Sequence, residues 1–449
     1  MVICLKDKTR HGLSLKKRDK LGLNSRDRIN LKIIFKNMSS VGAAIYATKK
    51  CHKFVGNVIK MLTFLMGHLY FSLLRVIVVD YVEDPKYIRS EEPLTFENYS
   101  LPPGDSTYSG LFRFNNIEQL QRLKRGFMIP DRVEIKRSWF TGDEILIISL
   151  LRLSYPSRWC DVQAKLPRDK VRTSTDCGKA FYWLIDFLIA NWGYLLLNNI
   201  SFWVGMFPHF ANQIRLKLQN LVTENYRQIH PEACILNGIQ TGFAIFGFID
   251  NTIMAMCRPG GGPLAEGEHA PRLSKEVQQT WSTGWKKLHG LKWQTVSLPN
   301  GLEMHAWGPL SCRRNDNHML NKSAIKNKIR DAQLGHELQY KIHGDSAYSE
   351  DNYLASGGGR GMASVRETIE WNYKDVKTTW KYIDYKHALK LHNQPLAKIF
   401  FVCMLLRNAH SCMNSNQTAL YFECMPPSFE EWLSQGPKAH PIDDTIFKA

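Results

Sequence analysis

An apolar stretch that ends on a single carboxylate constrains this 449-residue chain more than any other feature. Residues 244–250 read Ala-Ile-Phe-Gly-Phe-Ile-Asp, and a short, mostly apolar run of this kind predicts a buried strand. An ionised carboxylate beside a buried strand loses its hydration, so it needs a compensating charge. We therefore predict that Asp250 lies at the exposed end of this strand and helps to hold a cation.

Two later carboxylates complete a candidate metal site. Asp345 follows a predicted strand over 338–342, and Glu370 lies on a predicted helix over 363–383. Mg²⁺ and Mn²⁺ are hard cations that take oxygen ligands, and a pair of them can serve phosphodiester cleavage. Spacing alone leaves ordinary alternatives open: Asp250 as a loop cap, Asp345 as a turn residue and Glu370 as half of a surface ion pair.

The segments around these acids predict an α/β domain over 236–415, with a mixed sheet flanked by helices. Alternating residues over 291–297 and 302–307, joined by Pro-Asn-Gly, predict a hairpin. The other expected elements are a helix over 316–333 capped by Asp316, a flexible glycine-rich loop over 357–361, an apolar core helix over 389–411 and a tail over 416–449.

Residues 101–235 predict an all-helical domain in front of this sheet. Thr141-Gly-Asp-Glu144 reads as a capping box that starts one helix. A short helix over 158–166 and a third helix over 174–190 follow, which is the order of a helix-turn-helix module. The third helix would then offer DNA the residues Arg172, Ser174, Thr175 and Lys179. A helical packing domain without DNA contact is the alternative.

Positive charge is concentrated in the first domain, the basic and otherwise poorly defined region 1–100. Residues 1–60 supply +12 of the total net charge of +18. Such an excess predicts a polyanionic partner, and nucleic acid is the one we expect. Lys16-Lys-Arg18 with Lys20 is typical of a nuclear import signal or a DNA-binding arm, although a solvated tail gives the same pattern.

Cysteine spacing and hydropathy argue against two other classes of protein. None of the ten cysteines forms a Cys-x-x-Cys pair, so neither a zinc knuckle nor a redox motif is supported, and free thiols in a reducing compartment are expected. The apolar segment 61–79 contains His68 and Arg75. A spanning helix needs about 20 apolar residues with few charges, so we expect a buried helix there and no membrane partner.

Several motifs in a fixed order carry a resemblance to a known family. They are Gly-Phe-Ile-Asp at 247–250, Gly-Trp-Lys-Lys-Leu-His at 284–289, Leu-Pro-Asn-Gly at 298–301, Arg-Arg-Asn-Asp at 313–316, Gly-Asp-Ser-Ala-Tyr at 344–348 and Arg-Glu-Thr-Ile-Glu at 366–370. From Thr241 to about Cys412 the chain resembles the Harbinger superfamily of DDE transposases and their domesticated nuclease relatives.

The resemblance implies a fold, a reaction and partners. The fold would be ribonuclease H-like, with Asp250, Asp345 and Glu370 as the catalytic, metal-binding triad. The activity would be a nuclear DNA endonuclease or transposase that uses two Mg²⁺ or Mn²⁺ ions on double-stranded DNA. A Myb-like DNA-binding protein is an implied partner, and a homodimer is left open.

Basic residues in predicted loops are candidate phosphate ligands. They are Arg258, Lys286, Lys287, His289, Arg313 and Arg314. His289 has an equally good reading as a core histidine in a strand.

Two alternatives to an active nuclease are open. Ser282-Thr283 before Gly284, and the interval of only 25 positions from Asp345 to Glu370, depart from the family pattern. Both favour a catalytically inactive DNA- or protein-binding derivative. A glycosidase with paired carboxylates is a third reading and predicts metal-independent hydrolysis.

Overall fold

The computed structural model describes residues 92–102, 107–167, 170, 172–224, 243–259, 275–284, 286–336, 338–357, 359–391 and 393–438. All of them fall in one compact unit, Tyr87–Ala449. The predicted basic arm, import signal and apolar segment 61–79 lie outside the described residues.

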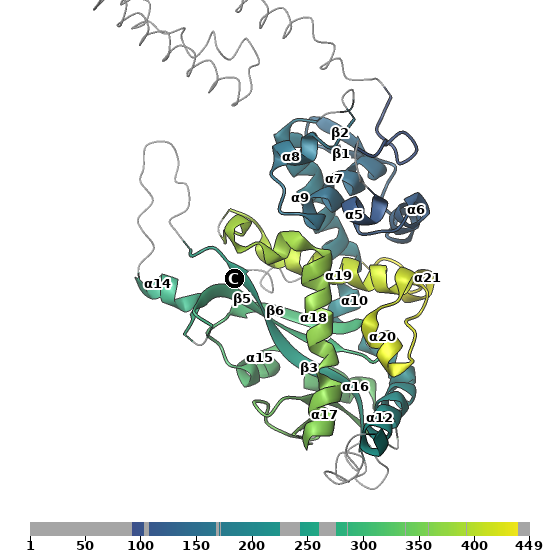
Figure 1. Cartoon of the computed structure of the whole chain (residues 1–449), viewed down its shortest axis with the longest axis vertical. Helices are drawn as coiled ribbons and strands as arrows, with labels where there is room; N and C mark the ends of the chain where they lie inside the picture. The colour runs from purple at the N-terminus through teal and green to yellow at the C-terminus, as the bar shows by residue number, and fades with distance from the viewer. Residues whose placement is uncertain are drawn as a thin grey trace, which may run out of the picture. The chain divides into compact units, whose positions relative to one another are not determined.

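The first described part is mostly helical, but the prediction of an all-helical domain is wrong because this part also contains a small β-hairpin. Its helices are α5 (Tyr108–Phe112), α6 (Ile117–Gly126), α7 (Gly142–Ser154), α8 (Trp159–Gln163) and α9 (Ser174–Trp192). Strands β1 (Arg132–Ile135) and β2 (Ser138–Thr141) pair antiparallel. Figure 1 shows α7 and α9 among the shorter helices of this part, and every residue of α7 is buried.

The predicted capping box at the start of α7 is half right. The Thr141 hydroxyl accepts a hydrogen bond from the Glu144 backbone N–H, which caps the helix. The Glu144 carboxylate does not reach back to the cap. It binds Arg172 instead, because both side chains are buried and need an opposite charge.

A mixed six-stranded sheet forms the second part of the unit. Its strands are β3 (Phe243–Met256), β4 (Ser282–Thr283), β5 (Leu288–Ser297), β6 (Glu303–Ser311), β7 (Gln339–Gly344) and β8 (Leu354–Ser356). The order is β4-β5-β3-β7-β8, and β6 pairs with β5. β3, β7 and β8 run parallel, whereas β5 is antiparallel to β3 and β6.

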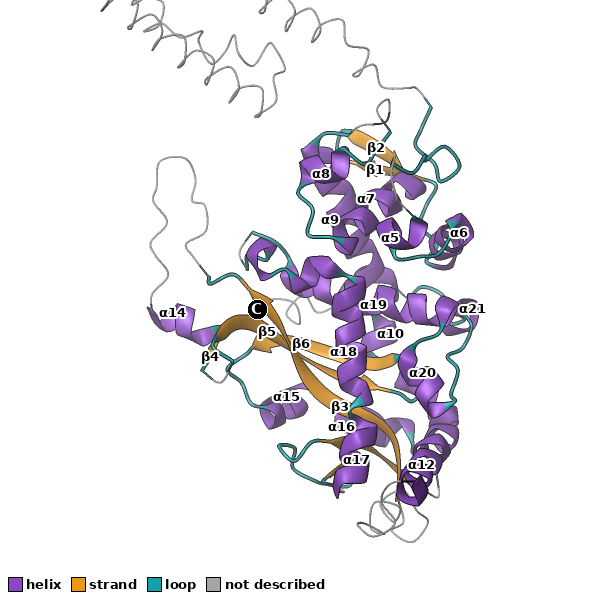
Figure 2. Ribbon diagram, in the orientation of Figure 1, coloured by secondary structure: helices purple, strands orange, loops and turns teal. Residues whose placement is uncertain are grey.

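The curled mixed sheet with helices around it is consistent with a ribonuclease H-like fold, and it confirms the predicted fold class (Figure 2). The β5–β6 hairpin was also predicted correctly. Its turn closes with a hydrogen bond of 2.9 Å from the Gly301 N–H to the Leu298 carbonyl. Gly301 has φ +75°, a conformation that glycine adopts without strain.

Helices between the two parts and after the sheet complete the unit. They are α10 (Tyr194–Leu197), α11 (Ile200–Trp203), η3 (Val204–Met206), α12 (Phe207–Glu224), α14 (Lys275–Thr280), α15 (Asp316–Ser323), α16 (Ile325–Ala332), α17 (Gly359–Arg366), α18 (Thr368–Thr379), η5 (Lys381–Asp384), η6 (Lys386–Ala388), α19 (Leu396–Asn414), α20 (Gln417–Phe422) and α21 (Phe429–Trp432). Helices α12 and α18 both contact β3.

Three predicted segments differ from the structure. The helix expected over 316–333 is interrupted at Ala324, which has φ +53°. The helix expected over 363–383 is two helices, and it starts inside the glycine-rich segment predicted as a loop, at Gly359. The segment predicted as a tail contributes α20 and α21, whose Phe429 and Trp432 are fully buried.

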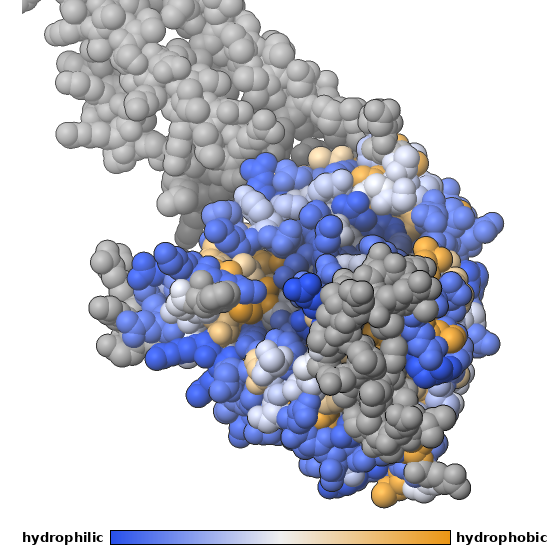
Figure 3. Space-filling model, turned by 60° about the horizontal axis from the view of Figure 1, so that its bottom comes forward, coloured by the Kyte–Doolittle hydropathy of each residue, from blue (hydrophilic) through white to orange (hydrophobic). Residues whose placement is uncertain are grey.

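Helix α19 is the predicted apolar core helix. It contacts α9, α18 and β6, so it lies between the helical part and the sheet. It is also the one described helix long and apolar enough to cross a membrane, but 78% of its most apolar window is buried inside the structure. The face of the molecule in Figure 3 is mainly hydrophilic, with apolar residues in small separate patches.

Candidate active site

Asp250 lies in the middle of β3, not at its end as predicted. The strand continues to Met256 because β5 pairs with it along its whole second half, from Phe248 to Met256. Its other neighbour, β7, pairs with it only as far as Phe248, which lies opposite His343. Asp250 therefore sits two residues beyond the point where one edge of β3 loses its partner.

Asp345 lies beside Asp250 at this point. It is two residues beyond His343, just as Asp250 is two residues beyond Phe248, so the parallel register places the two acids level with each other. Burial is the largest cause of the raised pKa of Asp250, and the charge of Asp345 adds a smaller rise. One oxygen of Asp345 accepts a hydrogen bond of 3.0 Å from the Ala347 N–H. The charges of the first two predicted acids thus interact, and their joint role in holding a metal ion stays a prediction.

The Asp250 carboxylate is held in an unfavourable charge environment. Burial is the main reason that its pKa rises from 3.8 to about 6. The backbone N–H of Asn251 and the guanidinium of Arg366 act in the opposite direction, whereas Asp345 and Asp316 raise the pKa further. Arg366 Nη1 lies 3.5 Å from Asp250 Oδ2, too far for a strong hydrogen bond. The site therefore has room for additional positive charge.

Helix α18 fixes the backbone of Asp250 from one face of the sheet. The Tyr373 hydroxyl donates a hydrogen bond of 2.7 Å to the Asp250 carbonyl and lies 2.9 Å from the Thr295 hydroxyl. Further along the helix, Lys377 donates to the Ile253 carbonyl. Tyr373 and Lys377, one turn apart on α18, thus bind the β3 backbone at Asp250 and at Ile253. Neither side chain was predicted from the sequence to have a role at the site.

The third predicted acid, Glu370, is exposed in the first turn of α18, three residues before Tyr373. Among the residues that the structure describes, no group of three or more His, Cys, Asp or Glu side chains is arranged to hold a metal ion. The convergence of Glu370 with the two aspartates therefore stays a prediction.

The acid found near Asp250 and Asp345 is Asp316, which sequence reading had set aside as a helix cap. That prediction is wrong, because Asn315 caps α15 by accepting a hydrogen bond from the His318 N–H. Asp316 Oδ1 accepts a hydrogen bond of 2.7 Å from Asn251 Nδ2 and forms an ion pair with Lys292.

Tyr348 shares with Asp316 a hydrogen bond to Asn251. Its hydroxyl is 2.9 Å from Asn251 Nδ2, and only 2% of the residue is exposed. Burial is the main reason that the pKa of Tyr348 is raised, and the charges of Asp250, Asp316 and Asp345 each add to it. The Gly-Asp-Ser-Ala-Tyr motif at 344–348 was the available sequence signal for this tyrosine.

The oxygen atoms at this point of the sheet suit a hard divalent cation. The carboxylates of Asp250 and Asp345 supply such oxygens. Magnesium and manganese prefer such an all-oxygen set. Asn251 is the next position of β3, so its side chain points to the other face of the sheet, with its Oδ1, a buried oxygen without a hydrogen-bond partner among the described residues, and with Asp316, which Asn251 binds. Asp250 and Asp345 are therefore the two described carboxylates here whose chemistry suits such an ion.

Comparison with known proteins supports this interpretation. Residues 269–408 match the model of a family described as DDE superfamily endonuclease. The match supports a DDE transposase-type nuclease. It contains Asp316, Asp345 and Glu370 and begins after Asp250. No curated protein and no solved structure matched the chain.

Of the basic residues predicted to bind DNA, two lie next to Asp316. Arg313 and Arg314 are exposed in the loop between β6 and α15, just before Asp316. The Arg314 carbonyl accepts a hydrogen bond from Lys292, the partner of Asp316. This loop can therefore present positive charge beside Asp316.

The other four predicted residues lie at the far end of β3. His289 is half-buried on β5 opposite Met256, six positions along β3 from Asp250 or about 20 Å. Burial and the charge of Arg258 lower the pKa of His289. Lys286 and Lys287 are exposed in the turn just before β5. The structure does not bring this group to the acids.

One of the predicted helix-turn-helix contacts is excluded. Arg172 is only 4% exposed and binds Glu144 through two contacts of 2.5 and 2.6 Å, so it cannot reach DNA. Ser174 and Thr175 are exposed at the start of α9. Lys179 is paired with Asp176 at 2.8 Å.

Proposed function

We propose that the chain is a metal-dependent DNA endonuclease of the Harbinger type, acting on phosphodiester bonds of double-stranded DNA. One observation carries the proposal. Asp250 and Asp345 each follow by two residues the last pair of β3 with β7, and residues 269–408, which contain Asp345, match the DDE endonuclease model. Strand joining, as in transposition, is the second step that this chemistry permits, because a freed 3′-hydroxyl can attack another phosphodiester.

The proposed cofactor is Mg²⁺ or Mn²⁺, held by Asp250 and Asp345 with Glu370 as third acid. Two such ions would make water a stronger nucleophile and neutralise the leaving oxygen. The chain's own residues prepare the site. Tyr373 fixes the backbone of Asp250, and Arg366 supplies a nearby positive charge that a phosphate can also use.

The remaining parts of the proposal concern partners and location. Arg313 and Arg314 would hold the DNA backbone beside the acids, and the basic region 1–60 would add sequence-independent affinity. A nuclear location, a Myb-like DNA-binding partner and a homodimer are proposed on the family resemblance. They rest on no contact in the structure.

Nicking of supercoiled plasmid DNA tests the reaction. We expect wild-type protein to nick with Mg²⁺ or Mn²⁺ and not with EDTA. Asp250→Asn and Asp345→Asn each keep the shape of the side chain and remove its charge, so each should lower the rate by at least about 100-fold. Asp331→Asn, an exposed acid on α16, is the matched control and should nick at the wild-type rate. Equal nicking by wild type and both site variants would refute the proposal.

Glu370→Gln and Asp316→Asn in the same assay assign the third acid. Loss of nicking in Glu370→Gln with wild-type nicking in Asp316→Asn would support the triad implied by the family. The reverse result would assign the third position to Asp316. Nicking that persists in EDTA would argue against metal-dependent chemistry; the glycosidase reading needs a separate glycoside substrate, hydrolysed without metal.

An inactive derivative is the second candidate, and one contact favours it. The guanidinium of Arg366 already lies at 3.5 Å from Asp250 Oδ2, where it competes with a cation for that oxygen. Under this reading the protein binds DNA but fails to nick it under every metal condition. Arg366→Gln tests this contact: if the guanidinium blocks the cation, a wild-type protein that binds DNA without nicking should gain nicking after the change, whereas an active enzyme that uses Arg366 for the phosphate should nick more slowly.

A further inference from the structure

A pocket far from the acids lies on the outer face of α9. It has a volume of about 680 Å³ and opens between α8, α9 and the β1–β2 turn. Its aromatic lining consists of Trp159, Tyr182 and Trp183. None of the proposed catalytic residues lines it. The size is within the range of small-ligand sites.

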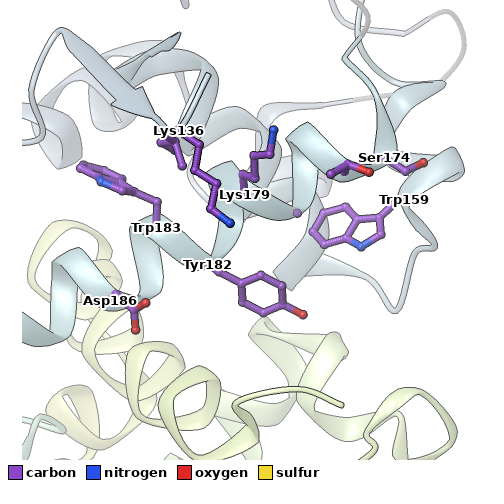
Figure 4. A pocket seen from close by; sticks show the side chains of 10 residues that line it. Lys136, Trp159, Ser174, Lys179, Tyr182, Trp183 and Asp186 are labelled. Carbon is purple, nitrogen blue, oxygen red and sulfur yellow. The ribbon is translucent and has the colours of Figure 1, made fainter. Parts of the chain in front are cut away.

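Positive charge and aromatic rings alternate across the pocket. In the view of Figure 4, Lys136 and Lys179 lie between the indoles of Trp183 and Trp159. The nearby acids are already neutralised, since Asp186 pairs with Lys398 at 2.9 Å and Asp176 pairs with Lys179 at 2.8 Å.

The uncompensated charge is on the hairpin turn. Lys136 and its neighbour Arg137 are exposed, and neither forms an ion pair within the described part of the chain. The turn therefore places net positive charge at the rim of an aromatic pocket. A ligand that matches this pocket carries a negative charge between flat rings.

Gly178 lines the pocket at a position where packing would also accept alanine. Gly178 lies inside α9, where glycine is less favourable than alanine. A Cβ at this position would meet only the Trp159 ring, at 3.9 Å, which is ordinary contact. The missing side chain leaves space above the helix next to an indole.

We propose that this pocket binds an unpaired stretch of nucleic acid, with bases stacked on Trp159 and Trp183 and a phosphate held by Lys136. Stacked aromatic rings with interspersed cations bind single strands without sequence preference. Assigning the strand as DNA rests on the proposed function, because cutting and strand transfer produce unpaired DNA beside the site of reaction. A duplex cannot use the pocket, because its bases are already stacked on one another.

The test uses fluorescence anisotropy with the full-length protein, in EDTA and on an Asp250→Asn background. The probe is a fluorescein-labelled oligo(dT) of about 20 nucleotides, and a duplex of the same length is the comparison. No step depends on cutting, so an inactive nuclease can still pass this test. A protein that nicks plasmid but fails here would leave the proposed function intact.

Two variants should weaken binding of the single strand. Trp183→Ala should weaken it by about 5- to 150-fold, the range for losing one stacked base. Gly178→Met should do the same by filling the pocket. Gly178→Ala is its matched control and should bind like wild type, because its Cβ is accommodated. Affinity for the duplex should change less than about twofold in every variant.

Charge removal gives an independent readout. Lys136→Ala should reduce the slope of log affinity against log salt by about 0.7, the value for one phosphate contact on a single strand. Lys390→Ala, another exposed lysine, is the control and should leave affinity for the single strand unchanged.

Photocrosslinking locates the strand directly. An oligonucleotide with 5-iododeoxyuridine should crosslink within residues 159–183. Crosslinks confined to residues 1–91, or single-strand affinity within twofold of wild type for Trp183→Ala and Gly178→Met alike, would overturn the proposal. The proposal would also be overturned if binding of an acidic, aromatic peptide were weakened in these variants while binding of the oligonucleotide was not.

Discussion

Asp250 makes the stability of the fold depend on pH, and one substitution can test this. Its pKa in the folded, metal-free protein is about 6, against 3.8 for an unburied aspartate. The fold therefore favours the protonated carboxyl, and it loses stability as pH rises through this interval. Asp250→Asn stays uncharged at every pH and escapes the loss. The variant should thus become more stable than wild type as pH rises.

The size of the effect follows from the two pKa values. A difference of about two pKa units corresponds to about 3 kcal/mol, and about 2 kcal/mol of it falls between pH 4.5 and pH 7.5. This is an upper estimate, because the side chain is 18% exposed. For a unit of roughly 360 residues, 2 kcal/mol corresponds to about 2–3 °C in Tm.

Thermal unfolding in EDTA across this pH range is the assay. Subtracting the Tm of wild type from that of Asp250→Asn cancels the other titrating groups, because both proteins share them. Asp331→Asn is the control and should give a difference near zero at every pH. A difference for Asp250→Asn that does not grow with pH would refute the burial argument. Addition of Mg²⁺ should raise the Tm of wild type and leave the variant unchanged.

Two further substitutions test contacts that hold the fold around the site. Arg172→Met leaves Glu144 buried without its partner and should destabilise the protein by about 3–5 kcal/mol in urea unfolding, whereas the double variant with Glu144→Leu should recover most of that loss. Arg172→Met with unchanged stability would contradict the buried pair. Tyr373→Phe removes the hydroxyl beneath Asp250 and should cost about 1–2 kcal/mol and slow nicking, while the exposed Tyr385→Phe should do neither.

Features set by neighbouring residues were predictable from the sequence. The Thr141 cap depends on a backbone N–H three residues away, and the turn at Gly301 depends on glycine at a positive φ. Alternating apolar residues located the hairpin, because a strand with one buried face has a period of two. The buried strand through residues 244–250 was visible for the same kind of reason.

Features set by distant partners were not predictable. The polar residues Asn251 and Thr252 made β3 look finished at Asp250. In the structure they stay in the strand because β5 bonds to them. Arg172 looked like a DNA contact until folding placed Glu144 against it. In both cases the deciding contact comes from an element tens of residues away.

The identity of the third acid could not be predicted from the sequence. The register of two parallel strands fixes the first pair, because neighbouring strands leave their carboxylates level. No register relates a helix to a strand, so the side chain that completes the site depends on how α18 or α15 packs against β3. Tyr373 and Lys377 place α18 along β3 while Glu370 stays exposed, and Asn251 holds Asp316 from the other direction. The choice between them is a difference in metal-bound free energy, which the metal-free contacts do not determine. That is why the paired Glu370→Gln and Asp316→Asn measurements decide it.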